Sequence, residues 1–321
     1  MPTAKSFNAA SPASDDEEPP EDTTAAIPLH SKKTERLQRK LAKRDQKRKA
    51  AASLSRLPTE LILDILKLLP PSDIYSCSSV DRRFHALVEA NANNVADDII
   101  RRRYAILVKC FPRPCLLSSV DAAIQPLLTD PSRQEKLSLH KKPYQHVQPP
   151  DHFLVCTCVT CILLWNNLGL VLDFAHWQDH LDSGTPIPIL PRGHKVDWNE
   201  ALVARNARIV RSSLTSTLSY ARILETHLHS TIRAIRRHGK NRGNKRKHVD
   251  MTNEDAALGN DQFLQKAGPL SLEFPFNRDE YHMLEAYLPN RWWRKNEQHW
   301  VYYIAGYHEK DLEYIVRMSN R

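Results

Sequence analysis

Five aliphatic residues recur at helical spacing around residue 65 and are followed at once by two prolines. The aliphatic residues are Leu61, Ile62, Ile65, Leu66 and Leu69. This spacing predicts a helix with one broad apolar side that must be buried. Pro58 suits a first helical position, where its missing N–H costs nothing, and Pro70 with Pro71 stops the helix. The segment is therefore expected to fold as a short amphipathic helix with sharply defined ends.

The residues after this helix predict two more helices. A second, short helix is expected over residues 73–77. Ser78 and Asp81 are spaced as in a capping box and indicate the start of a third helix. We expect the unit's own core to contain Val80, Phe84 and Leu87. Three helices within ~40 residues cannot bury the apolar stripe among themselves, so the remaining surface must meet the rest of the chain or another protein.

The whole segment LSRLPTELILDILKLLPPSDIYSCSSVDRRFHALV resembles the F-box family. The family pattern runs from Leu-Pro through Glu-Leu, Ile-Leu, Leu-Pro and Asp-Leu to a closing Val, a basic pair, an aromatic residue and Leu-Val. In this chain those places are filled by Leu57-Pro58, Glu60-Leu61, Ile65-Leu66, Leu69-Pro70, Asp73-Ile74, Val80, Arg82-Arg83, Phe84 and Leu87-Val88. Asp81 departs from the pattern, because many members have Cys there; an acid is well tolerated near a helix N-terminus.

The overall style of the chain is similar to that of fungal F-box proteins. The resemblance implies a non-catalytic chain that binds the Skp adaptor and, through it, the cullin core of a ubiquitin ligase. Carried over to this chain, the adaptor contact would be made by Leu57, Pro58, Leu61, Ile62, Ile65, Leu66, Ile74 and Cys77. The C-terminal region would hold a target protein and raise the effective concentration of its lysines near the ubiquitin-charged enzyme. The simpler alternative is a helical hairpin that packs only on its own domain. The sequence contains no Gly-rich phosphate loop, Gly-x-Ser-x-Gly or HExxH motif, so we expect no enzymatic activity.

The fold class expected for the whole chain is mainly α. A three-helix F-box would be followed by an irregular helical domain and by a small aromatic-rich α+β segment at the C-terminus. Further helices are predicted over residues 91–110 and 121–128, in the apolar stretch 153–181, and in one long helix over 197–239 that packs against that stretch. In the C-terminal segment, QHWVYYIAGYH predicts a strand and DLEYIVRM a short helix.

These elements divide the chain into three regions. Residues 1–50 are expected to be a disordered tail, acidic and then basic, in which the basic part fits a short solvated helix. Residues 54–112 would contain the F-box and the helix after it. Residues 113–321 would form the helical domain that recruits the target, with a basic loop at 236–253.

The chain has a net charge of +9, concentrated in residues 32–49 and 233–248. Such runs can bind nucleic acid, an acidic protein or an import receptor. The alternative function is therefore a basic nuclear scaffold or nucleic-acid-binding protein; under the F-box interpretation no nucleic-acid partner is expected. No apolar run approaches the ~18 residues that span a bilayer, and the N-terminus lacks the apolar core of a signal peptide. We expect a nuclear or cytoplasmic protein without a membrane contact.

Three closely spaced cysteines, Cys156, Cys158 and Cys161, form the most suggestive chemical cluster. Three thiolates at this spacing could hold zinc, with a fourth ligand from His152, His176 or His180. A closed zinc site usually has two separated cysteine pairs, and the second pair is missing here. Our interpretation is three small apolar side chains in a packed helix, so we assign no metal ligand and no cofactor. The zinc alternative stays open.

The C-terminal part of the chain is rich in aromatic residues. Most of them are expected to pack a core against the long helix, because aromatic side chains are usually at least half buried. Two tryptophans beside two arginines are the best candidates for exposure. Aromatic and arginine side chains dominate the binding energy of protein interfaces. We therefore predict that Arg291, Trp292, Trp293 and Arg294 contact the target.

Overall fold

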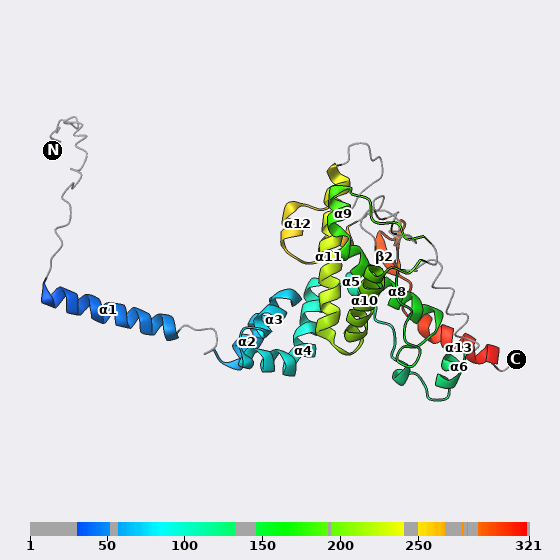
Figure 1. The fold of residues 1–321 in the computed structure, drawn as a ribbon, viewed down its shortest axis with the longest axis horizontal. Helices are drawn as coiled ribbons and strands as arrows, with labels where there is room; N and C mark the ends of the chain where they lie inside the picture. The colour runs from blue at the N-terminus through cyan, green and yellow to red at the C-terminus, as the bar shows by residue number, and fades with distance from the viewer. Residues whose placement is uncertain are drawn as a thin grey trace, which may run out of the picture. The chain divides into compact units, whose positions relative to one another are not determined.

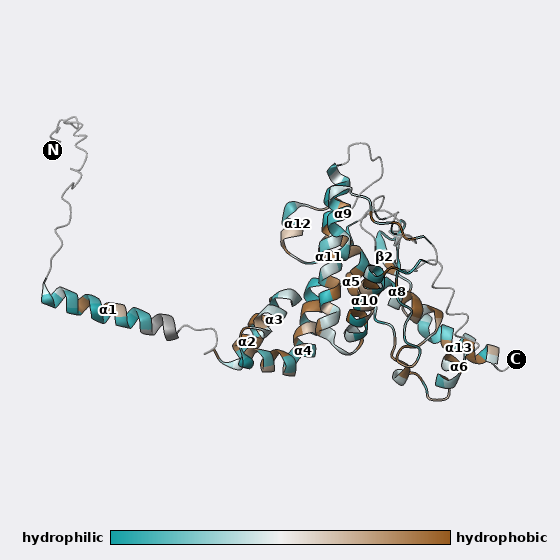
Figure 2. Cartoon of the chain, in the orientation of Figure 1, coloured by the Kyte–Doolittle hydropathy of each residue, from teal (hydrophilic) through white to brown (hydrophobic). Residues whose placement is uncertain are grey.

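The computed structural model describes residues 31–51, 57–131, 146–191, 194–240, 250–266, 278, 281 and 288–319. The chain divides into two compact units, Met1–Arg56 and Leu57–Arg321. The first contains α1 (Lys32–Ala51), drawn in blue in Figure 1 and mostly hydrophilic in Figure 2. The solvated helix expected for the first basic run is thus present. The disorder predicted for residues 1–30 lies outside the described residues.

The second unit begins with three helices, α2 (Thr59–Leu66), α3 (Pro71–Ser78) and α4 (Arg82–Arg103), which we call the N-terminal unit. Pro58 precedes the first helical residue of α2, and Pro71 is the first residue of α3. The predicted capping box is wrong by three residues: Asp81 is itself the N-cap of α4 and accepts a hydrogen bond from the Phe84 amide at 2.8 Å.

α4 is one continuous helix where the sequence predicts two. The expected break near residue 90 contains neither Gly nor Pro, so nothing there interrupts the hydrogen-bond ladder. The helix ends at Arg103 and is followed by the single turn of α5 (Leu107–Cys110). Asp261 accepts hydrogen bonds from the amides of Ile106 and Leu107, both at 2.7 Å, and so caps this turn from a distant part of the chain.

The centre of the second unit is formed by α8 (Val159–His176), α9 (Gln178–Ser183), α10 (Asp197–Thr215) and α11 (Thr217–Lys240). The predicted packing of the long helical segment on the apolar stretch is confirmed, because α10 and α11 both contact α8 (Figure 1). The prediction of one long helix is wrong. The chain leaves helical geometry at Ser216, whose hydroxyl accepts from the Ser219 amide at 3.2 Å, and serine favours such a capping position over a helix interior.

By length and composition alone, α8 is long and apolar enough to cross a membrane, which corrects the expectation that no segment approaches this length. Buried residues make up 72% of it. They include Trp165, Leu168 and Phe174, which belong to the main hydrophobic core together with residues of α4, α10 and α11. This is the behaviour of a core helix, and the expectation of no membrane contact is not contradicted.

Short elements precede α8 and follow α11 in the chain. They are η2 (Leu117–Ser119), α6 (Gln125–Thr129), α12 (Asn253–Ala257) and η4 (Gln262–Gln265). The helix predicted over residues 121–128 is reduced to α6, since residues 122–124 form a turn. α11 continues through Lys240, so residues 236–240 of the predicted basic loop are helical; residues 241–249 lie outside the described part.

The C-terminal segment consists of two strands and a helix. β1 (Arg291–Arg294) pairs antiparallel with β2 (His299–Tyr302) in a register that places Trp293 opposite Trp300. α13 (Tyr307–Ser319) follows. The mainly α fold with a small sheet near the C-terminus is confirmed, as are the strand and the helix predicted for this segment. β1 was not predicted, because RWWR is too short to show a strand period.

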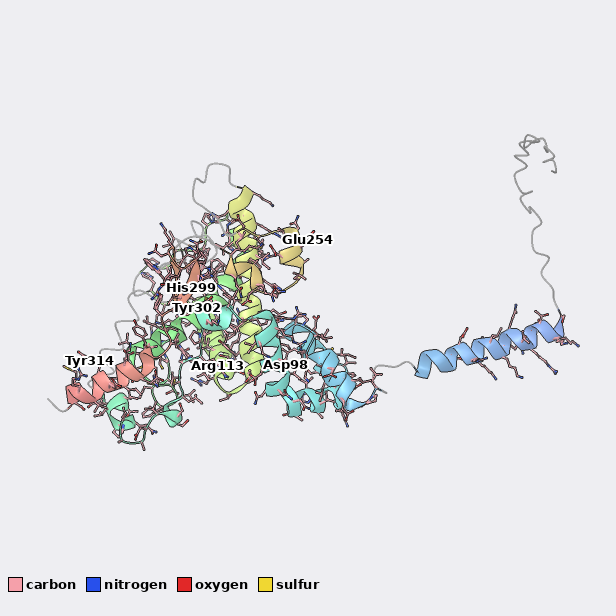
Figure 3. All side chains as sticks on the ribbon, turned by 180° about the vertical axis from the view of Figure 1, so that it is seen from behind. Asp98, Arg113, Glu254, His299, Tyr302 and Tyr314 are labelled. Carbon is pink, nitrogen blue, oxygen red and sulfur yellow. The ribbon has the colours of Figure 1, made fainter. Side chains whose placement is uncertain are left out.

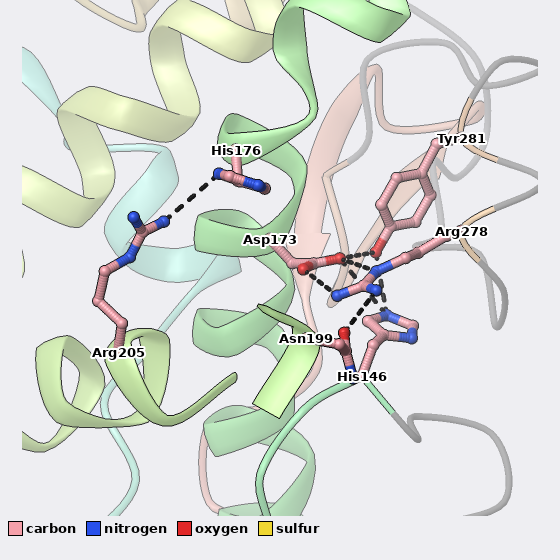
Figure 4. Close-up of polar contacts among 7 residues, drawn as sticks. All are labelled: His146, Asp173, His176, Asn199, Arg205, Arg278 and Tyr281. Atoms are coloured by element: carbon pink, nitrogen blue, oxygen red, sulfur yellow. Dashed lines mark hydrogen bonds and ion pairs between the residues drawn. The ribbon is translucent and has the colours of Figure 1, made fainter. Parts of the chain in front are cut away.

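A buried polar network attaches residues 278 and 281 to α8 and α10 (Figure 4). The Arg278 guanidinium donates to both carboxylate oxygens of Asp173, at 2.7 and 2.9 Å, and to Asn199 Oδ1 at 2.7 Å. The Tyr281 hydroxyl lies 3.0 Å from His146 Nε2 and donates to Asp173 at 3.2 Å. Burial lowers the pKa of His146 to about 4, so this imidazole is neutral at neutral pH.

Candidate functional site

The N-terminal unit is held against α11 through one buried carboxylate. Glu225 of α11 accepts hydrogen bonds from the amide and the hydroxyl of Ser72, at 3.0 and 2.6 Å, and from Arg222 at 2.9 Å. Pro70, the N-cap of α3, makes no side-chain cap, so Glu225 satisfies an amide at the start of that helix instead. Figure 1 shows α3 and α4 close to α11. The boundary predicted between residues 112 and 113 falls inside this one compact unit.

α2 has one apolar side turned to the protein and another turned outward. Ile62 and Leu66 are each 1% exposed and pack in the main core. Leu61 is 51% exposed and Ile65 is half-buried, and residues four apart share one side of a helix. Leu68, in the turn that follows α2, is 59% exposed. We call Leu61, Ile65 and Leu68 the outer stripe.

The residues predicted to bind the adaptor are therefore divided between these two sides. Ile62, Leu66 and Ile74 are buried in this chain's own core, so in this structure they are packing residues. The reason is tertiary: α2 and α3 pack on α4, and α11 covers α3 and α4, and a local sequence pattern does not reveal that cover. The adaptor contact stays a prediction for the exposed and half-buried residues, which are Leu57, Pro58, Leu61, Ile65 and Cys77.

The core predicted for the N-terminal unit needs one correction. Phe84 and Leu87 are buried as predicted. Val80 is 73% exposed, because it lies in the turn between α3 and α4 and not on a helix. Val80 is thus a further apolar side chain that this unit leaves uncovered.

A second site lies where α13 meets the start of α8. The Sγ atoms of Cys156, Cys158 and Cys161 and a ring nitrogen of His308 all lie within 4.8 Å of one another. The distances from His308 Nδ1 to the three sulfurs are 4.0, 3.4 and 3.4 Å, respectively. The three cysteines are buried and His308 is half-buried. We call these four residues the Cys3His cluster.

Hydrogen bonds within the Cys3His cluster favour a thiolate at one of its cysteines. Contacts from the Cys158 and Cys161 side chains lower the pKa of the Cys156 thiol. The contact with Cys156 raises the pKa of Cys158. The pKa of Cys161 is also raised, through its contacts with Cys115, Cys156 and Cys158. Three buried cysteines beside an imidazole offer the sulfur and nitrogen ligands that a soft or borderline cation prefers.

None of the three histidines considered as a fourth ligand belongs to this cluster. His152 stacks on Phe153, His176 lies 3.5 Å from Arg205 (Figure 4), and His180 packs on Trp177. His308 takes the fourth place, 147 residues after Cys161. The sequence carried little signal for it, because a lone histidine in a distant helix has no spacing relation to the cysteines.

The predicted target-binding residues lie on both sides of β1. Arg291 is 1% exposed, stacks on the Trp300 ring at 3.7 Å and donates to the Leu264 carbonyl at 2.8 Å. Trp293 is also buried, with its ring 5.1 Å from that of Trp300. Strand alternation turns every second side chain inward, so Arg291 and Trp293 are packing residues in this structure. The target contact stays a prediction for Trp292 and Arg294, which are exposed.

The comparisons with known proteins bear on the N-terminal unit. The F-box-like family model matches residues 54–92. No curated protein and no solved structure matches the chain. The family match covers α2, α3 and the first part of α4, where the sequence pattern places the Leu-Pro turn and the closing basic pair. The chain is therefore an F-box domain protein, with its F-box-like domain at residues 54–92.

Proposed function

We propose that this protein is a substrate-recognition subunit of a ubiquitin ligase of the Skp–cullin–F-box type, acting in the nucleus or the cytoplasm. The single observation that carries the proposal is the F-box-like domain at residues 54–92, since domains of this family generally bind the Skp adaptor. Its role is positional and needs no catalytic residue in this chain. A target held on the C-terminal region reacts faster because its lysines are kept close to the charged enzyme.

The outer stripe is the part of the domain best suited to the adaptor contact. Its side chains are apolar and more exposed than the core residues beside them on α2. Pro58 is exposed at the start of the same helix. Apolar side chains clustered on one surface mark a protein contact more often than isolated ones do. The adaptor contact is therefore assigned to Pro58, Leu61, Ile65 and Leu68.

The target contact is assigned to the outward side of β1. Trp292 is 54% exposed, and the nearby Arg294 is exposed and paired with Glu297 at 2.9 Å. Tryptophan and arginine are among the residues most enriched where binding energy is concentrated. The inward residues Arg291 and Trp293 would then hold the strand in place for the two outward ones.

The adaptor contact is tested by co-purification of the full chain with the Skp adaptor. Leu61→Asp combined with Leu68→Asp should abolish binding, because two charges would have to be buried in an apolar contact. Both side chains are exposed in this chain, so the variant should keep its far-UV circular dichroism and melting temperature.

A matched control is Ile189→Asp, which introduces the same charge at an apolar residue that is 72% exposed and lies outside the domain. It should bind the adaptor as the unchanged protein does. Adaptor binding that survives the double substitution would contradict the assignment of the outer stripe. Failure of the unchanged chain to bind any Skp adaptor would contradict the proposed function itself.

A further inference from the structure

We propose that the Cys3His cluster is a structural zinc site that attaches α13 to the start of α8. The distances between the four donor atoms fit a zinc ion. Four ligands around a tetrahedral zinc ion, with Zn–S near ~2.3 Å and Zn–N near ~2.0–2.1 Å, place each sulfur about 3.6 Å from the nitrogen. In this chain His308 Nδ1 lies 3.4, 3.4 and 4.0 Å from the sulfurs of Cys158, Cys161 and Cys156.

The three sulfurs of the cluster accept hydrogen bonds from backbone amides. Cys156 Sγ accepts from the Cys158 amide at 3.5 Å, and Cys158 Sγ accepts from the Cys161 amide at 3.3 Å. Cys161 Sγ accepts from the Cys115 amide at 3.4 Å. Each cysteine of the cluster thus receives one backbone N–H. Such outer contacts orient metal-bound ligands and tune the site.

A second contact beside the cluster positions α13 against α8. Asp311, three residues after His308, accepts from the Thr160 amide at 2.7 Å. One side of α13 therefore carries both a cluster ligand and a cap for the N-terminus of α8, where a carboxylate is favourable. α13 is therefore held at two points: His308 contacts the cysteines, and Asp311 accepts the hydrogen bond from Thr160.

The apolar cluster around these residues is small. The three cysteines pack with Leu117, Val120, Leu128 and Ile315 in a cluster separate from the main core. In the described part of the chain Ile315 is the only buried residue of α13, and Tyr314 beside it is 59% exposed (Figure 3). So little buried apolar surface contributes little to holding this helix in place, and a metal ion bound by His308 would add a further attachment.

The chemistry of the donors selects the metal and its role. Three thiolates and one imidazole in a tetrahedral arrangement suit zinc better than magnesium, calcium or manganese, which prefer oxygen ligands. Four protein ligands fill a tetrahedral shell and leave no open position for a substrate, which is the mark of a structural site. The inference is independent of the proposed ligase function, since zinc would be needed for the fold of the C-terminal segment in either case.

The test is the metal content of the full chain purified under reducing conditions without added metal. We expect stoichiometric zinc by mass spectrometry of the acid-released ion, and release of that zinc when the thiols are titrated with a mercurial reagent. Replacement by cobalt should give the absorption of a tetrahedral thiolate complex. Absence of zinc even after supplementation of the growth medium with zinc, or iron in its place, would overturn the proposal.

Variants then identify the ligands. Loss of an outer contact of a metal site alone lowers the affinity by about 10- to 100-fold. Cys158→Ser and His308→Ala remove direct ligands, so each should lower the zinc affinity by at least that much. His308→Cys should recover part of that affinity, because a fourth thiolate also completes a zinc site. This rescue separates loss of a ligand from loss of the fold.

Two matched controls keep the test specific. His299→Ala removes an exposed histidine of the same segment (Figure 3), and Cys115→Ser changes a cysteine that contacts Cys161 but is not one of the four residues of the cluster. Both should retain stoichiometric zinc and the cobalt spectrum. Zinc that survives in His308→Ala but is lost in Cys115→Ser would overturn the assignment of His308 as the fourth ligand.

Discussion

The N-terminal unit and the C-terminal segment are attached to the central helices in different ways. The N-terminal unit places Ile62, Leu66 and Ile74 in the main hydrophobic core and adds one buried carboxylate contact, through Glu225. The C-terminal segment consists of a two-stranded sheet and one amphipathic helix, with few fully buried apolar residues among those described. Buried polar contacts and the Cys3His cluster join that segment to the rest of the chain. Apolar packing, by contrast, joins the N-terminal unit to it.

This contrast explains how each region can work. A domain joined to the core by its inner side can expose its outer stripe without losing its fold. A segment fixed by a few directional contacts depends on each of them, because removing one leaves the others with unpaired polar groups. Substitutions on the inward and outward sides of each region should therefore differ in their effect.

The most severe loss of stability is expected at the sheet of the C-terminal segment. Trp293→Ala removes a buried ring that packs edge-to-face on Trp300, and should lower the free energy of unfolding by about 3–5 kcal/mol. Trp292→Ala, at the preceding residue, removes an exposed ring and should cost less than about 0.5 kcal/mol. Urea unfolding followed by circular dichroism measures both. Equal losses in the two variants would show that β1 does not have the alternating burial described here.

A similar contrast is expected in the N-terminal unit. Ile74→Ala removes a side chain that is 0% exposed and should cost about 2–5 kcal/mol of unfolding free energy. Leu61→Ala, on the outer stripe, should change stability by under about 1 kcal/mol while it weakens adaptor binding. Thermal unfolding measures the stability of both variants, and titration with the adaptor measures how tightly each one binds it. A large stability loss in Leu61→Ala would remove the distinction between the two sides of α2.

The carboxylate contact between α11 and α3 should have a smaller but clear effect. Glu225→Ala leaves the Ser72 amide and hydroxyl and the Arg222 guanidinium without their shared acceptor. We expect a loss of about 2–3 kcal/mol, as for a buried charged hydrogen bond. Glu200→Ala is the matched control, since Glu200 lies on α10 with its side chain 54% exposed. Hydrogen exchange should become faster in α3 in the first variant only; unchanged exchange would mean that Glu225 does not hold the N-terminal unit.

The weakest effect is a pH dependence that arises at His146. Burial lowers its pKa from 6.5 to about 4, so between these values the unfolded chain binds more protons than the folded one. Stability must then fall as the pH falls below 6.5, by about 1 kcal/mol at a pH of about 5.5. Asp261 acts in the opposite direction, because burial raises its pKa to about 6. The comparison of the unchanged protein with His146→Gln isolates the histidine, since both keep Asp261 and the Cys3His cluster.

The measurement is the unfolding free energy of both proteins at neutral pH and at a pH of about 5.5. The difference between them should shift by about 1 kcal/mol in favour of His146→Gln at the lower pH. A shift of the opposite sign would mean that His146 is protonated in the folded protein. In that case the hydrogen bond with Tyr281 and the charge of Asp173 would outweigh burial.

Local sequence patterns were sufficient to predict the N-terminal unit and most of the helices. Leu57–Val88 carries its information at short range: helix period, proline stops and pair spacing all lie within a few turns of one another, and such patterns are set by backbone geometry. The same reasoning identified the apolar stretch around α8 and the strand and helix near the C-terminus. It failed near residue 90, where α4 continues without the predicted break, and at Ser216, where a single capping serine divides one predicted helix into two.

Packing between distant segments determines which residues of α3 are covered, which residues of β1 face inward, and which histidine joins Cys156, Cys158 and Cys161. Each of these depends on residues far apart in the chain: α11 on α3 and α4, Leu264 beside Arg291, and His308 beside the start of α8. The physical reason is the same in all three cases. A local pattern fixes the shape of an element and the spacing of its side chains, but contact between distant elements depends on how the whole chain packs.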